Sequence, residues 1–318
     1  MRRSRCSARL AALVTLGSLA ACGGDERAPD PAGGPPASPA FMPAGPLEDD
    51  IWLADLTWEA SGQPSLGQPV NLTERPGYDN QPAFVPDGSG LWYTAVDVHD
   101  GQTDIWRFDF APGSVARVTM SNPESEYSAT PLPDGSGISA VRVEADSTQR
   151  LWRFDPDGSN AAVLLEDVAP VGYHAWADAG TLVLFVLGEP ASLVVADVGT
   201  GATEVVARDI GRSIQPIPGS ANVSFVQRAA DGGSTIMRLR PSTGVIEPLI
   251  DAVEGGDFHA WAPNGALLMA HESAMFAWRP GGEGWRQVAD FASLGLSITR
   301  LAVSPDGAQI ALVARVGM

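Results

Sequence analysis

The stretch VPDGSGL at residues 85–91 returns almost unchanged as LPDGSGI at 132–138 and as SPDGAQI at 304–310. In the first copy, Pro86 fixes φ near the value that the second position of a type I turn needs, and Gly88 supplies a positive φ two residues later. The flanking runs PAFV and LWYTAV are apolar or alternating, as strands are. Each copy therefore predicts a β-hairpin.

The hairpin phrase belongs to an internal repeat that runs along most of the chain. Six cognates are found, and their turn positions are separated by 40 to 47 residues. A period of this length indicates one supersecondary unit per repeat. The six turn positions, called the turn anchors below, are Pro86, Pro133, Asp178, Pro218, Pro263 and Pro305.

A second phrase recurs in step with the first. It reads DIWLADL from residue 50, DIWRFDF from 104 and RLWRFDP from 150, and weaker copies occur in the other units. A further strand-like run follows each copy, so each unit is expected to contain four short strands. Four antiparallel strands repeated six times predict an all-β fold, the six-bladed β-propeller.

The two ends of the chain complement one another in this scheme. Residues 50–73 supply the third and fourth strands of a unit, and residues 299–314 supply the first and second. We expect the N-terminal strands to pair with the C-terminal strands, which closes the sixth blade and leaves no open sheet edge. The predicted propeller spans residues 50–318, and we expect it to be a monomer.

The W-x-P-D-G phrase, followed by an I-W-x-x-D strand, resembles the repeat of the TolB-type propeller family, also called the PD-repeat or WD-repeat-like family. The resemblance covers residues 50–318, although the third unit has DAG at 178–180 and the fourth has PGS at 218–220. It implies a scaffold that binds an envelope protein or a peptide. The small α/β domain that precedes the propeller in TolB is expected to be absent, with a tether in its place.

The first residues predict export and lipid attachment. An arginine-rich start precedes an apolar stretch of about 12 residues, which is too short to span a bilayer and predicts a signal peptide over residues 1–21. The phrase LAAC that ends this stretch resembles the lipobox of bacterial lipoproteins, so Cys22 is the predicted lipidation site. Residues 22–49, rich in Pro, Gly and Ala, predict a tether. By family analogy, Gly23 favours the outer membrane, on its periplasmic side or at the cell surface.

Charge and cysteine content narrow the function classes. The net charge is −18, and every basic residue is an arginine. A surface this acidic repels nucleic acid, and it either steers basic partners or serves solubility alone. Of the two cysteines, Cys6 lies in the predicted signal peptide and Cys22 would carry lipid, so we expect neither a disulfide nor a free thiol in the mature chain.

Polar side chains concentrate where the chain is expected to lead into the inner strand of each blade. In a propeller, these segments frame one mouth of the central channel. They predict a partner- or ligand-binding mouth made of Asp79, Asn80, Gln81, Glu126, Tyr127, Tyr173, His174, Gln215, Asp257, His259 and Arg300.

Two histidines occupy the same slot of an H-A-W-A phrase in the third and fifth units. His174 and His259 could form a metal- or ligand-binding pair, with Glu126 and Asp257 nearby. The alternative is that each histidine forms a hydrogen bond to a neighbouring blade. The sequence indicates no cofactor apart from the divalent cation of the first alternative, and it does not identify the metal.

Catalytic motifs are sparse. The sequence has no G-x-S-x-G and no cysteine nucleophile, which favours a binding role over an enzymatic one. The alternative is a propeller enzyme or small-ligand binder similar to six-bladed lactonases. Its metal or sugar-acid site in the central channel would use Asp79, Asn80, Glu126 and Asp257.

Overall fold

The computed structural model describes residues 48–97, 99 and 101–317. The predicted signal peptide, the lipidation site Cys22 and the tether up to residue 47 lie outside the described residues. Within the described part, the regular structure is β-strand apart from one short 3-10 turn, η1 (Ala292–Leu294). No helix in this part is long and apolar enough to cross a membrane.

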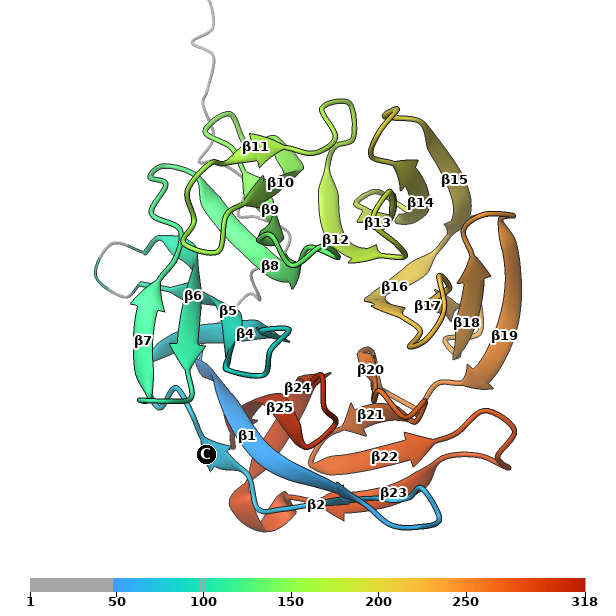
Figure 1. The fold of residues 1–318 in the computed structure, drawn as a ribbon. Coiled ribbons are helices and arrows are strands. Elements are labelled where there is room, and N and C mark those ends of the chain that lie inside the picture. Colours follow the sequence, from blue (N-terminus) through green and yellow to red (C-terminus); the bar gives the residue numbers. More distant parts are fainter. Residues whose placement is uncertain (1–47, 98, 100, 318) are drawn as a thin grey trace, which may run out of the picture. The chain divides into compact units, whose positions relative to one another are not determined.

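Five blades are each built from four consecutive antiparallel strands, and Figure 1 shows the blades arranged around a common centre. Blade 1 contains β4 (Gly77–Phe84), β5 (Gly90–Val96), β6 (Thr103–Asp109) and β7 (Ser114–Arg117). Blade 2 contains β8 (Ser125–Pro131), β9 (Ile138–Val143), β10 (Gln149–Phe154) and β11 (Ala162–Val163). Blade 3 contains β12 (Val171–Trp176), β13 (Thr181–Val186), β14 (Ser192–Asp197) and β15 (Thr203–Arg208). Blade 4 contains β16 (Ile210–Pro216), β17 (Val223–Arg228), β18 (Ser234–Arg240) and β19 (Val245–Asp251), and blade 5 contains β20 (His259–Trp261), β21 (Leu267–His271), β22 (Ala274–Trp278) and β23 (Arg286–Asp290).

The sixth blade joins the two ends of the propeller. Its strands are, in order, β24 (Leu296–Val303), β25 (Gln309–Val316), β1 (Glu48–Trp58) and β3 (Val70–Asn71), with β2 (Pro64–Leu66) also paired to β1. The blue β1 lies beside the red β25 in Figure 1, and the two strands pair antiparallel from Asp50 opposite Ala314 to Asp55 opposite Gln309. The predicted closure of the ring by N-terminal and C-terminal strands is confirmed.

The hairpin turns follow the predicted chemistry. Gly88 has φ of 75°, and Asp87 Oδ1 accepts a hydrogen bond of 2.9 Å from the backbone N–H of Ser89. The second glycine of the phrase, Gly90, is required for a different reason. A Cβ at Gly90 would lie 2.1 Å from the carbonyl oxygen of Phe108 on the neighbouring strand, so only glycine fits there.

Apolar side chains of adjacent blades form the core between the sheets. One cluster joins blades 2, 3 and 4 and includes the fully buried Leu184, Phe225 and Leu239. A second cluster joins blades 5 and 6 and includes Leu268 and Leu312. Burial of each such side chain stabilises the fold by about 1.5–3 kcal/mol, so packing between sheets holds the blades together.

Candidate functional site

A central cavity of about 640 Å³ lies among the inner strands β4, β8, β12, β16, β20 and β24. All six turn anchors line it, so each repeat contributes its first hairpin turn to the wall. Cavities of about 300–1,000 Å³ are typical of small-molecule and cofactor sites. The cavity is therefore large enough to be a candidate binding site.

One residue of each blade, five positions before its turn anchor, also lines the cavity. In five of the blades the inner strand is irregular near this position, and a β-bulge re-aims a side chain; in blade 5, Phe258 directly precedes β20. The strand register shifts between Asn80 and Ala83 in β4 and between Ile298 and Arg300 in β24. We call these six residues the cavity ring: Gln81, Ser128, Tyr173, Ser213, Phe258 and Arg300.

Arg300 connects opposite sides of the ring. It lies on β24 in blade 6, and its guanidinium carbon is 3.8 Å from the ring centroid of Phe258 in blade 5. Its Nη2 donates a hydrogen bond of 3.3 Å to the hydroxyl oxygen of Tyr173 in blade 3. The rings of Tyr173 and Phe258 meet edge to face at 6.3 Å. Stacking on two aromatic rings fixes the position of the cation within the cavity.

The two histidines of the H-A-W-A phrases make identical contacts. Nε2 of His174 lies 2.7 Å from Oγ of Ser139, and Oγ of Ser139 also accepts a hydrogen bond of 2.9 Å from Nε1 of Trp176. Ser139 belongs to β9 of the preceding blade, so this cluster ties blade 3 to blade 2. The geometry is that of the second alternative in the sequence analysis, in which each histidine contacts a neighbouring blade.

His259, Trp261 and Ser224 repeat this cluster between blades 5 and 4, with distances of 2.7 Å to the histidine Nε2 and 2.8 Å to the tryptophan Nε1. Burial lowers the pKa of each histidine, His174 and His259, to about 3. Both imidazoles are therefore neutral near pH 7. Nδ1 of each has no hydrogen-bond partner among the described residues, and both histidines line the cavity.

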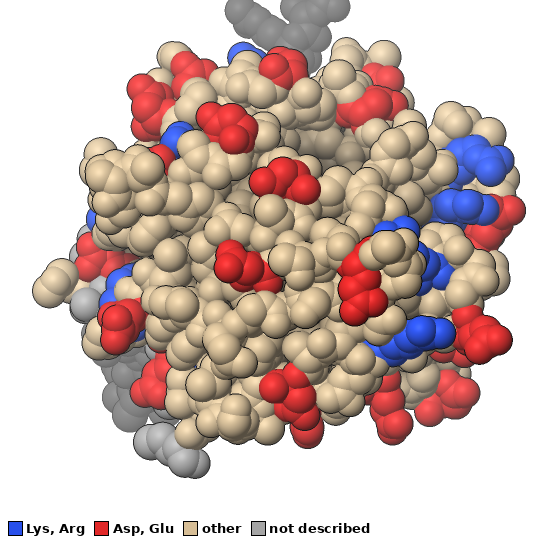
Figure 2. Space-filling model, turned by 60° about the horizontal axis from the view of Figure 1, so that its bottom comes forward, with Lys and Arg blue, Asp and Glu red and all other residues tan. Residues whose placement is uncertain are grey.

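Charge is distributed differently on the surface and in the cavity. Figure 2 shows acidic side chains spaced over one side of the propeller, with basic side chains gathered at the edge where Figure 1 places β15, β18 and β19. The cavity lining instead contains Arg212 and Arg300, and Asp178 is its one carboxylate within the described part. Asp178 accepts a hydrogen bond of 2.9 Å from the backbone N–H of Gly180, so this carboxylate stabilises the hairpin turn in which it lies.

No family model and no curated protein sequence matches this chain. Solved structures do match it. A putative TolB from Agrobacterium tumefaciens superposes with a TM-score of 0.65 at 14% identity, covering 86% of this chain and 100% of the other. TolB from Acinetobacter baumannii gives a TM-score of 0.54 at 12% identity, covering 84% of this chain and 64% of the other. The fold is a TolB-type β-propeller.

Other propellers share the architecture. An oligogalacturonate lyase solved in complex with manganese has a TM-score of 0.53 at 16% identity, covering 82% of this chain and 78% of the other. At identities this low, likeness establishes a common fold, and function has to be argued from the residues of the site.

In this TolB-type propeller, the predicted mouth residues fall into two groups. Six of them line the cavity together: Gln81, Tyr173, His174, Gln215, His259 and Arg300. The remaining ones are not part of the cavity wall as described: Asp79, Asn80, Glu126, Tyr127 and Asp257.

The residues outside the cavity wall lie mainly in junctions between blades. Asp79 is fully buried and forms an ion pair with Arg75, and Asn80 donates a hydrogen bond of 3.1 Å to Oδ2 of Asp49. Tyr127 is also buried. Asp257 differs, since it is partly exposed and lies 3.7 Å from Nη2 of Arg228.

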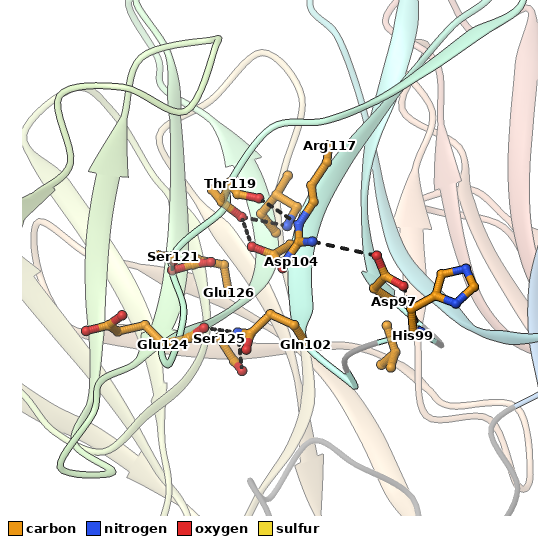
Figure 3. A network of polar contacts seen from close by, with 12 residues as sticks. Asp97, His99, Gln102, Asp104, Arg117, Thr119, Ser121, Glu124, Ser125 and Glu126 are labelled. Carbon is orange, nitrogen blue, oxygen red and sulfur yellow. Dashed lines mark hydrogen bonds and ion pairs between the residues drawn. The ribbon is translucent and has the colours of Figure 1, made fainter.

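Glu126 belongs to a polar network between blades 1 and 2, most of which Figure 3 shows. Its Oε1 accepts hydrogen bonds of 2.7 Å from Nε of Arg142 and 2.5 Å from Oγ of Ser121. Asp104 pairs with Arg117 and accepts a hydrogen bond of 3.0 Å from Oγ1 of Thr119. Burial raises the pKa of both carboxyl groups, and the nearby arginines act in the opposite direction.

The lactonase-like alternative needs carboxylates grouped near the axis. Asp79 and Glu126 instead belong to different junctions, and each is paired with an arginine. Among residues 48–97, 99 and 101–317, no three His, Cys, Asp or Glu side chains come close enough to hold a metal ion.

Sequence reasoning did not single out several residues of the cavity. Ser128, Ser213 and Phe258 belong to the ring, and Arg212 adds a second positive charge. A signal for the ring was present in the repeat, since its members stand at one fixed distance before the turn anchors. The repeat gives no signal that would have predicted Arg212 as a cavity residue.

Proposed function

We propose that this chain is a lipid-anchored protein of the cell envelope whose TolB-type propeller binds a peptide segment of another protein in the central cavity. The observation that carries the proposal is the cavity of about 640 Å³ on the axis of the ring, with aromatic, hydroxyl, amide and guanidinium groups in its wall. Such a mixture of apolar surface and a few placed polar groups is typical of binding sites.

The anchor and the location rest on the N-terminal sequence. The signal peptide, the lipobox at Cys22 and the tether would hold the propeller at the outer membrane, within reach of envelope partners. The test is incorporation of a labelled fatty acid during growth. We expect label in the wild-type chain and none in Cys22→Ser, and equal labelling of both would refute lipid attachment at this residue.

The binding role is tested by photo-crosslinking in intact cells that naturally produce the chain. A photoreactive amino acid replaces Gln215, which lines the cavity, or Val205, which is exposed on the outer strand β15. We expect one partner peptide, identified by mass spectrometry, to crosslink from position 215 and not from position 205. Crosslinks from position 205 alone, or none from either position, would contradict a peptide site in the cavity.

A further inference from the structure

The polar atoms left without partners in the cavity wall are mostly hydrogen-bond donors. Arg300 provides five N–H groups, and the hydrogen bond to Tyr173 is the one that the described residues form with it. No carboxylate of the described chain forms an ion pair with Arg300 or with Arg212. Nε2 of Gln81, a donor on a side chain that is 4% exposed, also has no partner among the residues that the structure describes.

The hydrogen bonds of Ser139 and Ser224, called the serine clusters below, also determine which ring nitrogen of each histidine carries the proton. Trp176 donates to Oγ of Ser139, so the serine's own proton is directed either to Nε2 of His174 at 2.7 Å or to the carbonyl oxygen of Thr130 at 3.3 Å. The shorter contact is the stronger hydrogen bond. A neutral imidazole that accepts at Nε2 carries its proton on Nδ1, which makes Nδ1 of His174 a donor.

The cluster at His259 gives the same result independently. Ser224 lies 2.7 Å from Nε2 of His259 and 3.3 Å from the carbonyl oxygen of Gln215, while Trp261 donates to its Oγ. Nδ1 of His259 is therefore also a donor without an acceptor among the described residues. Buried polar groups are almost always paired in folded proteins, so these unpaired donors, together with the N–H groups of Arg300, leave the region around the cavity with an excess of donors that favours an acceptor-rich ligand.

A carboxylate matches this wall. It is an acceptor with two oxygens and about four lone-pair sites, and it pairs with a guanidinium through two parallel hydrogen bonds. Phe258 and Tyr173 hold the guanidinium plane in place, so little side-chain freedom is lost on binding. We propose that the central cavity binds a carboxylate through Arg300, and that this carboxylate belongs to a side chain or the C-terminus of the bound peptide. This inference rests on the proposed function for the peptide as its source.

The negative charge of the chain limits how many further acidic residues the bound peptide can carry. The full chain has a net charge of −18, so it repels a segment that carries many acidic residues. This long-range repulsion is screened beyond about 8 Å at physiological ionic strength, whereas contact with Arg300 is local. The expected ligand therefore carries one carboxylate in a segment that is otherwise neutral or basic.

A library of random heptapeptides, each with a free C-terminus, is selected on the purified full chain in detergent. The best peptide is then remade with its carboxylates converted to amides, and both forms are titrated into wild type, Arg300→Gln and Arg300→Lys by calorimetry. Arg240→Gln, at an exposed arginine at the end of β18, is the matched control. Circular dichroism and unfolding curves establish that each variant is folded.

We expect the amide form to bind wild type about 10- to 100-fold more weakly than the acid, as the loss of a charge-assisted hydrogen bond predicts. Arg300→Gln should lose the same factor for the acid and nothing further for the amide. Arg300→Lys should recover part of the loss, and Arg240→Gln should match wild type. Equal binding of acid and amide, or equal binding by wild type and Arg300→Gln, would overturn the carboxylate assignment and leave peptide binding intact.

A selection that yields no peptide would count against the proposed function alone. Glutarate and its neutral analogue glutaramide are then titrated into wild type and Arg300→Gln. Glutarate binding that is lost in the variant and absent for glutaramide would retain the carboxylate site and make its source a free small acid. Binding of neither compound would overturn the inference.

Discussion

Charged side chains are arranged in opposite ways in the blade junctions and in the central cavity. Beside the junctions, buried carboxylates of the inner strands meet nearby arginines: Glu126 on β8 pairs with Arg142 on β9 of the same blade, and Asp79 pairs with Arg75 just before β4. In the cavity, Arg300 lies on aromatic rings, and the described residues offer it no carboxylate. Each of the paired arginines is occupied by a buried carboxylate, whereas an arginine left unpaired remains available to a ligand.

The two arrangements are separated by two positions of the repeat. Asp79 and Glu126 stand seven residues before their turn anchors, and Arg300 stands five before its own. The bulges of the inner strands lie between these positions, as the register shift from Asn80 to Ala83 shows. A bulge therefore decides which side chains enter a junction and which reach the cavity.

The largest expected effect comes from breaking the buried ion pair between β8 and β9 of blade 2. Glu126→Ala leaves Arg142 without its buried partner, and removal of one member of a buried pair costs about 3–5 kcal/mol. Urea unfolding of the full chain measures the change. The control is Glu247→Ala, which removes a partly exposed pair with Arg238 and should change stability far less. Equal losses in the two variants would contradict the structural role of the buried pair.

The pH dependence of stability tests a second buried carboxylate, Asp79, which pairs with Arg75. Burial raises the pKa of Asp79 from 3.8 to about 6, although Arg75 opposes the shift. Between about pH 4 and 6 the unfolded chain has lost this proton and the folded chain retains it, so stability falls as pH rises through this window. The decline attributable to Asp79 is at most about 3 kcal/mol. Asp79→Asn should flatten this part of the curve, and an unchanged slope would refute the assignment.

A smaller effect is expected at the serine clusters. Ser139→Ala and Ser224→Ala each leave a buried tryptophan N–H without its acceptor, which costs about 1–3 kcal/mol. Because the clusters lie at different blade junctions, the losses should be similar and additive. Chemical denaturation of both single variants and the double variant measures this, with Ser136→Ala in an exposed turn as control. Losses that are unequal or strongly coupled would show that the two clusters do not serve the same purpose.

The fold was predictable because its signals are local. Turn chemistry at Pro86 and Gly88 places a hairpin without knowledge of the rest of the chain, and a regular period then implies blades. The half-units at the two ends predicted the strand pairing of the sixth blade. The contact of His174 and His259 with a neighbouring blade was also predicted, as one of two alternatives. The prediction was possible because a phrase that recurs in a repeat protein indicates a contact that recurs as well.

The composition of the cavity was less predictable. Whether Asp79 or Gln81 reaches the cavity depends on the bulge between them, and the positive φ of 57° at Gln81 has no signal in the residue type. The partners of the acids were also hidden, since Arg142 lies 16 residues from Glu126 on the next strand. Phe258 and Tyr173 become neighbours of Arg300 only when the ring closes.

The stability of Arg300→Gln tests most directly whether the buried ion pairs hold the fold and the cavity arginine is left for a ligand. The measurement is the free energy of unfolding of the full chain without ligand, by urea denaturation. The variant should lose no more than about 2 kcal/mol, the stabilisation that stacking on Phe258 can supply. A loss as large as that of Glu126→Ala would make Arg300 a structural brace across the ring and would contradict the account.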